Sequence, residues 1–261
     1  MQEPPLSRVK LSDQVVDRIK FWLMSRNMQP GDRLPSEKEL IGLLGVSRGT
    51  MREALKALEV QGLINIAPGR SGGAVVAEVR YETAAGLLSN YFYFQRLGAA
   101  EIYDMRQRIE PEMAVSVVDR LDEADFARLR ELIDACHEVA DTPEARRQQR
   151  LDELEFHNVL AMRSPNRFYG FSCRFINKVL ADQVVFKRMY EGRQTRIDNE
   201  NHAAHSELLA AYLARDPDRV RTAMTRHMRE CACHISELEA EVQSSFFSDP
   251  PFVGGSLGAR K

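Results

Sequence analysis

Three histidines and one glutamate stand at spacings that suit a metal site. Glu153 and His157 are four residues apart, so on a helix they would lie on the same face. His205 and His227 belong to two further segments, and three helices could bring all four side chains together inside a bundle. Three imidazoles and a carboxylate suit a divalent ion, zinc before nickel or manganese, with open positions for water or a ligand oxygen. The alternative is an ordinary packing or surface role for each histidine.

A second group of residues is basic, lies near the N-terminus and suits the binding of a DNA duplex. Arg48 and Arg52 are four residues apart, so they share a helix face from which each guanidinium can bind a guanine edge or a phosphate. The free amides at the start of such a helix also favour a phosphate. The candidate DNA contacts are Lys38, Ser47, Arg48, Thr50, Arg52, Gly69 and Arg70. Taken singly, each of these could instead be an exposed side chain without a partner.

The segment that carries the basic residues predicts a winged helix-turn-helix domain over residues 1–79. Apolar residues at helical spacing, a capping-box pattern and a glycine-rich turn between two β-type runs are the signals. The predicted elements are a helix over about 11–25, a short helix that Ser36 caps and Gly45 ends, a helix that Ser47 caps, and strands over Leu63–Ile66 and Ala74–Val76. The third helix would then carry the paired arginines, and the hairpin tip would carry the wing residues.

The pattern of the remaining chain predicts an all-α bundle that would hold the metal ligands. Helical periodicity predicts about six helices between residues 99 and 243, with no convincing strand. We therefore expect a helical domain over 98–243, a connector over 80–97 and a disordered tail over 244–261. The run Tyr91–Phe94 is too apolar for a free linker, so we expect it to pack on the second domain. The predicted fold is mainly α.

Composition limits the classes of function. The chain has 261 residues, with 36 basic and 38 acidic side chains and a formal net charge of −2, which excludes a uniformly basic coat for nucleic acid. The charge is uneven, because residues 1–80 carry +3 and the remainder −5. Four cysteines without a CxxC pair argue against a disulfide framework and a cysteine zinc finger. No run approaches the ~18 apolar residues of a membrane span, so we expect a cytoplasmic protein without membrane contact.

The N-terminal motifs resemble the GntR family of bacterial transcription regulators. The matching segments are Gly31 to Leu40, Leu44 to Arg48, Arg52 to Leu55, Leu58-Glu59 and Gly62 to Ile64. The resemblance implies that the residues at the places of Lys38, Ser47, Arg48, Thr50, Arg52 and Gly69 contact operator DNA. Gly49 departs from the pattern, since many members carry a larger residue such as threonine there. That change removes a possible base contact and lowers helix propensity.

The second part resembles the FCD effector domain of the FadR subfamily. The segments that carry this resemblance are Ile102 to Arg106, Ile109-Glu110, Phe156 to Leu160, His205 to Ala211, Asp216, Ala223 and His227. Metal-binding members use three histidines, which match here, and an Asp four residues before the first. Glu153 occupies that place, whereas Asp152 lies about 100° around the helix, so we assign Glu153. Arg106 matches an arginine that often faces the ligand cavity, and its alternative role is an ion pair with Glu110.

These observations together predict a ligand-responsive bacterial transcription regulator. The expected partners are double-stranded operator DNA, a second copy of the chain in a homodimer, and a small carboxylate effector bound beside the metal. Relief of repression by the ligand is the commoner mode in the resembling family, but the residues do not fix its sign. We expect no enzymatic activity. Two alternatives stay open, namely a metalloenzyme built on the glutamate and three histidines, and a regulator whose metal is purely structural.

Overall fold

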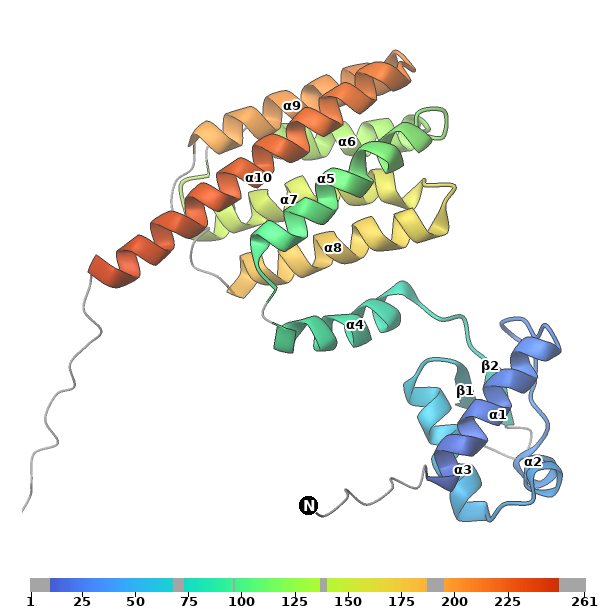
Figure 1. Cartoon of the computed structure of the whole chain (residues 1–261). Helices are drawn as coiled ribbons and strands as arrows, with labels where there is room; N and C mark the ends of the chain where they lie inside the picture. The colour runs from blue at the N-terminus through green and yellow to red at the C-terminus, as the bar shows by residue number, and fades with distance from the viewer. Residues whose placement is uncertain (1–9, 68–72, 96, 137–139, 187–194, 249–261) are drawn as a thin grey trace, which may run out of the picture. The chain divides into compact units, whose positions relative to one another are not determined.

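The computed structural model describes residues 10–67, 73–95, 97–136, 140–186 and 195–248. The chain divides into two compact units, Met1–Asn90 and Tyr91–Lys261, each of which has its own core. The fold is mainly α-helical with one small sheet (Figure 1), as the sequence predicts. No helix in these ranges is long and apolar enough to cross a membrane.

The first unit is a winged helix-turn-helix domain. Its elements are α1 (Leu11–Ser25), α2 (Glu37–Leu44), α3 (Arg48–Val60), β1 (Ile64–Ala67) and β2 (Gly73–Val76). The strands form an antiparallel pair in which Ile64 lies opposite Val76. α1 and α3 pack together through buried apolar residues, among them Ile19, Met51 and Leu58. Burial of this apolar stripe holds α3 so that its polar face stays exposed.

Capping residues set where the second and third helices begin and end. The hydroxyl of Ser36 accepts from the amide of Glu39, and the Glu39 carboxylate accepts from the amide of Ser36, which completes the predicted capping box. Gly45 ends α2 with a φ of 64°, a left-handed conformation that glycine adopts without strain. Ser47 then caps α3 by accepting from the amide of Thr50. The two caps fix the tight turn that positions α3.

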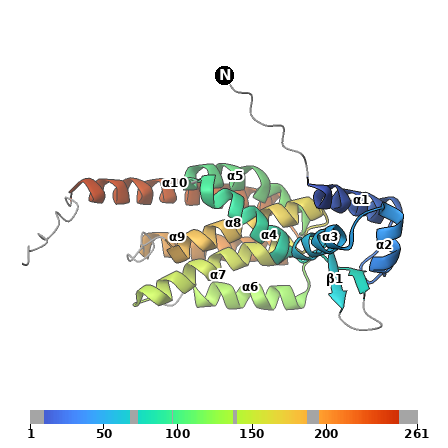
Figure 2. The same ribbon diagram turned by 90° about the horizontal axis from the view of Figure 1, so that it is seen from below.

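The second unit is an all-α bundle of six helices in the described residues, as predicted. They are α5 (Ala99–Ser116), α6 (Glu123–Ala135), α7 (Pro143–Met162), α8 (Arg167–Phe186), α9 (Thr195–Leu213) and α10 (Pro217–Ser248). Figures 1 and 2 show them side by side, with α10 packed against both α5 and α9, and α7 against α6 and α8. Phe156, Leu208 and Met224 are fully buried where α7, α9 and α10 meet. This is the part of the core that also holds the histidines.

The predicted connector and tail both contain helix. The connector forms α4 (Tyr81–Gln95), and the division between the two units falls within it. Phe92 packs its ring 5.7 Å from the ring of Phe175 on α8, whereas Tyr93 and Phe94 are exposed. α10 runs to Ser248, past the predicted start of the tail, and residues 249–261 lie outside the described part of the chain.

Candidate functional site

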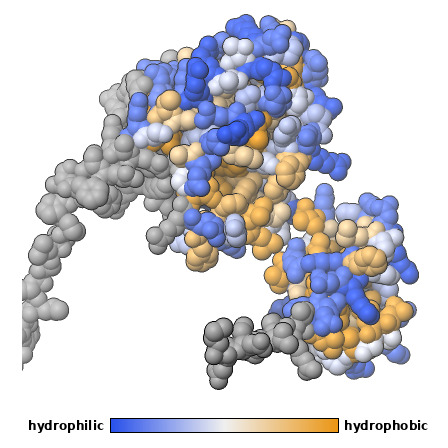
Figure 3. All heavy atoms as spheres, in the orientation of Figure 1, coloured by the Kyte–Doolittle hydropathy of each residue, from blue (hydrophilic) through white to orange (hydrophobic). Residues whose placement is uncertain are grey.

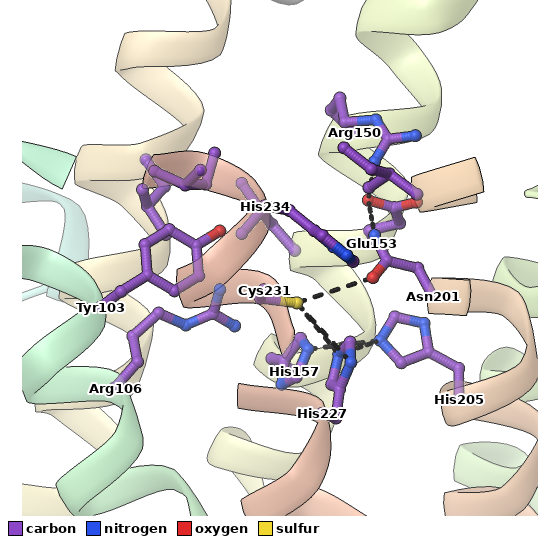
Figure 4. A pocket seen from close by; sticks show the side chains of 14 residues that line it. Tyr103, Arg106, Arg150, Glu153, His157, Asn201, His205, His227, Cys231 and His234 are labelled. Carbon is purple, nitrogen blue, oxygen red and sulfur yellow. Dashed lines mark hydrogen bonds and ion pairs between the residues drawn. The ribbon is translucent and has the colours of Figure 1, made fainter. Parts of the chain in front are cut away.

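The three predicted histidine ligands meet in the core of the bundle. His157 comes from α7, His205 from α9 and His227 from α10, and each is about 2% exposed. The Nε2 atom of His205 lies 3.3 Å from Nε2 of His157 and 3.1 Å from Nε2 of His227 (Figure 4). The ring of Phe156 stacks on that of His205 with centroids 4.0 Å apart, which holds this imidazole in place. Among the described residues these three form the one group with ligand atoms close enough to share a metal.

Electrostatics favours neutral imidazoles at this cluster. Burial lowers the pKa of His157 and lowers the pKa of His205 and His227 well below the ordinary value of 6.5. A neutral imidazole keeps one nitrogen lone pair for a metal. A single hydrogen on Nε2 of His205 cannot form good hydrogen bonds to both Nε2 of His157 and Nε2 of His227. A cation, in contrast, can bind all three nitrogens.

The spacing of the nitrogens passes the geometric test for a metal. With metal–nitrogen bonds of about 2.0–2.1 Å, the two measured separations correspond to ligand angles of about 95–110°. That range lies between octahedral and tetrahedral coordination, so zinc, nickel and manganese all fit the donor set. Three protein ligands leave further coordination positions for water or a ligand oxygen. The residues present therefore fit a divalent ion.

Glu110 on α5 lies directly behind the histidine cluster. It is fully buried, and its Oε2 atom is 2.6 Å from Nδ1 of His157. Burial alone would raise the pKa of the Glu110 carboxyl, but Arg106 and His157 outweigh that effect and hold the pKa well below its ordinary range. A carboxylate at Nδ1 fixes the proton on that nitrogen and presents Nε2 to the metal position. The sequence indicated Glu110 only as a neighbour of Arg106.

Arg106 forms the ion pair that the sequence offered as its alternative role, and it also lines the cavity. Its Nε atom donates to Oε1 of Glu110 at 2.5 Å, which is the ion pair expected from their spacing. Its Nη2 atom is buried and has no hydrogen-bond partner in the structure. The residue also lines the same cavity as the three histidines, with Tyr103 beside its guanidinium. Arg106 thus keeps one buried donor available for a ligand.

Glu153 lines this cavity, but the structure does not bring its carboxylate into the histidine cluster. Its Oε2 atom accepts from Nη1 of Arg150 at 2.9 Å and from Nδ2 of Asn201 at 3.1 Å. Its Oε1 atom is buried without a hydrogen-bond partner. Asp152 bonds instead to Gln148 on the same helix. The assignment of Glu153 as a metal ligand therefore stays a prediction.

The cavity is small, and its remaining lining is apolar in part. It has a volume of about 60 Å³. The thiol of Cys231 lies 3.6 Å from Nδ1 of His227 and 3.6 Å from Oδ1 of Asn201 (Figure 4). The aliphatic part of the lining consists of Leu154, Leu180, Ile197 and Ile235. Arg150 and Asn201 were not among the residues selected from the sequence, because nothing in their local spacing indicates a site.

The candidate DNA contacts of the first unit gather at the start of α3. Arg48, Arg52 and Lys38 are exposed, whereas the Ser47 hydroxyl bonds to the amide of Thr50 and lies 2.9 Å from its hydroxyl. Arg52 donates through Nε to Oε1 of Glu37 on α2 at 3.3 Å. The wing residues Gly69 and Arg70 lie outside the described residues.

Comparison with known proteins matches both units. The family model for bacterial regulatory proteins of the gntR family covers residues 11–73, and the FCD domain model covers residues 101–230. The repressor NanR of Cronobacter sakazakii is 28% identical over 230 residues, which span 86% of this chain and 85% of that protein. The Exu regulon transcriptional regulator of Escherichia coli is 26% identical over 228 residues, 85% of each chain.

A solved structure supports the fold. The GntR protein of Streptococcus agalactiae aligns with a TM-score of 0.57 and 21% identity, over 85% of this chain and 99% of that chain. The two domain matches and the named relatives agree with the fold, which has a winged domain followed by a helical bundle. The chain belongs to the GntR family of bacterial regulatory proteins, and it is a transcription regulator with an FCD domain.

Proposed function

We propose that this regulator senses a small organic acid that binds beside a divalent metal in the helical domain, as in the FadR subfamily. One observation carries the proposal: three neutral histidine nitrogens and the unpartnered Nη2 atom of Arg106 line one buried cavity. A guanidinium and a metal are the two groups that bind a carboxylate most strongly inside a protein. The acid then controls the affinity of the winged domains for operator DNA.

In the sensing site each residue has a separate task. His157, His205 and His227 would hold the metal, which when bound would supply Lewis-acid binding of an effector oxygen. Glu110 orients His157 through Nδ1. Arg106, fixed by the same carboxylate, donates Nη2 to the effector carboxylate. The effector is thereby held between α5 and the three histidine-bearing helices, so its binding favours one arrangement of those helices.

On the DNA side, α3 enters the major groove. The proposed contacts are Lys38, Ser47, Arg48, Thr50 and Arg52, with Gly69 and Arg70 of the wing. Ser47 supports the first turn of α3 through its cap, and Arg48 and Arg52 read the base edges or phosphates. Repression relieved by the acid is the mode we propose, because NanR relatives are named repressors. Relatives of this kind are regulators by name, so we propose no catalytic activity and a location in the cytoplasm with the DNA.

A homodimer would present two winged domains to the two halves of a pseudo-palindromic operator. The helical unit carries exposed aromatic side chains that suit such an interface. Tyr93 and Phe94 on α4 and Phe168 on α8 are each more than three-quarters exposed. Figure 3 shows apolar residues gathered on one face of the helical domain. Large exposed apolar patches commonly mark protein–protein contacts.

Selection of a binding site from a random duplex pool, followed by fluorescence anisotropy, tests the DNA-binding part of the proposal. We expect a specific operator, whose affinity falls at least tenfold in the double variant Arg48→Ala/Arg52→Ala. The control variant Arg18→Ala removes an exposed charge from α1 and should weaken binding only slightly. Equal, weak binding of all sequences by the parent protein and the double variant would contradict the proposal.

Thermal shift measurements distinguish a metal that takes part in sensing from a metal that is purely structural. Metal-loaded and metal-free protein are each melted with and without a panel of short organic acids. Stabilisation by an acid in the metal-loaded form alone supports sensing, because the acid then needs the metal. Stabilisation by metal with no effect of any acid would indicate that the ion only holds the bundle together.

A further inference from the structure

The histidine cavity needs an entrance before it can take up a metal ion or an effector. Every described residue that lines it is buried except Arg150, which is half-buried. The three histidines themselves are each about 2% exposed. Entry of an ion or an organic acid therefore requires that part of the lining moves. That movement is easiest where a single side chain separates the cavity from solvent.

A groove between α9 and α10 lies beside this lining. It has a volume of about 490 Å³, and every residue that lines it belongs to one of these two helices. Residues of the groove and of the cavity lie close together on both helices. On α9, Glu200 lines the groove and Asn201 the cavity; on α10, Cys233 lines the groove and Cys231 the cavity. The two packed helices therefore form the wall between the groove and the cavity.

His234 on α10 is the one described residue that lines both the cavity and the groove. It is about 5% exposed, and Figure 4 shows it among the cavity side chains. Its Nε2 atom lies 2.8 Å from Oε2 of Glu200, so this contact joins α10 to α9. At this position the wall is one imidazole thick, and a carboxylate on the groove side contacts that imidazole.

The contact between His234 and Glu200 can open without a large rearrangement. The Glu200 side chain is 41% exposed, so water replaces the imidazole as its partner when the two separate, and pairs of this kind contribute little to stability. The groove provides space for the displaced ring, because the small side chains of Ala203 and Ala204 form part of its lining. Rotation of one side chain between staggered positions leaves the two helices packed.

We propose that the side chain of His234 closes the entrance to the histidine cavity and moves into the groove to admit the metal ion and the effector. Glu200 holds it in the closed position. The inference goes beyond the proposed function, and only its zinc test rests on that function. A residue that controls entry alone changes the rates of ligand uptake and release by the same factor and leaves the affinity unchanged, whereas a residue that supports the site changes the affinity.

The first test measures entry with a thiol reagent and needs no metal. Cys231 lines the cavity and Cys233 the groove, whereas Cys173 is buried on α8. In chelator-treated full-length protein, each thiolate displaces iodide from iodoacetamide, and fragment mass spectra give the rate for each cysteine. In Glu200→Ala we expect Cys231 to react at least about fivefold faster than in the parent protein, with Cys233 and Cys173 within about twofold, because the closed position is the one that Glu200 stabilises.

Glu207→Ala is the matched control for this test. Glu207 lines the same groove and pairs with Arg226, so its loss removes another contact between α9 and α10 that does not involve His234. The control should leave the rate at Cys231 within about twofold of the parent protein. An unchanged rate at Cys231 in Glu200→Ala would overturn the inference. Equal acceleration of Cys231 and Cys173 would overturn it too, because the whole bundle would then be loosened.

The second test removes the proposed closing side chain. In His234→Ala we expect Cys231 to react at least about fivefold faster than in the parent protein. Addition of Glu200→Ala should then give no further increase, because the carboxylate acts only through the imidazole and the two changes are not additive. A further fivefold increase in the double variant would overturn the inference, since Glu200 would then act on another part of the wall.

The third test follows zinc itself. Stopped-flow mixing with a chromophoric chelator gives the rate constants for zinc uptake and release by the full-length protein. In Glu200→Ala we expect both constants to rise at least about threefold and by the same factor, with the zinc dissociation constant within about twofold of the parent value. Faster release without faster uptake would make Glu200 a support of the metal site and overturn the inference. If the parent protein binds no zinc, the proposed metal site is wrong, and the thiol rates still decide whether His234 controls entry.

Discussion

Substitution of Glu110 by glutamine tests how the proposed metal site is built. Glu110 is fully buried, with one oxygen 2.6 Å from Nδ1 of His157 and the other 2.5 Å from Nε of Arg106. Glutamine keeps the size of the side chain and removes its charge. Loss of a carboxylate behind a metal-bound histidine typically lowers metal affinity about 10–100-fold, which corresponds to about 1.4–2.7 kcal/mol.

The same substitution also affects the stability of the metal-free protein. Removing one partner of a buried ion pair leaves the other charge uncompensated, at a cost of about 3–5 kcal/mol. The Arg106 guanidinium would be that charge, and glutamine can still accept one hydrogen bond from it, so we expect the lower end of this range. Metal affinity must therefore be measured on samples shown by circular dichroism to be folded.

The assay is competition for zinc against a chromophoric chelator, with urea unfolding of the metal-free protein in parallel. Glu112→Gln is the matched control, since Glu112 lies on the same helix but is about half exposed and pairs with Arg221 at the surface. The control should keep its zinc affinity and lose less than about 1 kcal/mol of stability. If Glu110→Gln unfolds more easily but binds zinc as tightly as the parent protein, then Glu110 only supports the fold and our account of the metal site is wrong.

Three further results are expected. Burial lowers the pKa of His205 and His227 well below 6.5, so the metal-free folded protein binds fewer protons than the unfolded protein below pH 6.5. Its free energy of unfolding in urea should therefore fall by up to about 1.4 kcal/mol per pH unit per histidine as the pH drops from 6.5. A free energy of unfolding that does not change with pH would refute the lowered pKa of these histidines. A Cβ atom on Gly170 would lie 2.6 Å from a backbone oxygen of α7. Gly170→Ala should therefore lower the free energy of unfolding by about 1–3 kcal/mol and lower the thermal midpoint. An unchanged midpoint would contradict this packing. A Cβ atom on Gly49 would meet a single neighbour at 3.7 Å. Gly49→Ala should therefore leave the stability of the winged domain unchanged or raise it by up to about 1 kcal/mol in thermal unfolding. A clear loss of stability would contradict the geometry of α3.

Local patterns in the sequence were sufficient for much of the fold. The capping box at Ser36, the left-handed Gly45 and the hairpin after α3 depend on residues a few positions apart, and all three form as predicted. The convergence of His157, His205 and His227 was also predicted, because spacing within each helix and the family resemblance pointed to one bundle core.

The parts of the site that sequence did not reveal depend on contacts between distant segments. The approach of Glu110 to His157 joins α5 to α7, and the bond from Asn201 to Glu153 joins residues 48 positions apart. Helical periodicity places a side chain on a face but does not say which neighbour that face meets. The spacing of Glu153 and His157 therefore suggested a shared metal, whereas packing turns the Glu153 carboxylate toward Arg150.

The central claim is that an acid bound beside the metal on three histidines controls operator binding. The most direct test is the operator dissociation constant, measured by anisotropy with and without a short organic acid that stabilises the metal-loaded protein, in zinc-loaded protein and in protein treated with a chelator. Allosteric coupling of about 1–3 kcal/mol predicts that the acid weakens operator binding about 5–150-fold in the zinc-loaded protein and has no effect after zinc removal. An operator affinity that the acid leaves unchanged in the zinc-loaded protein, or shifts equally without zinc, would contradict the account.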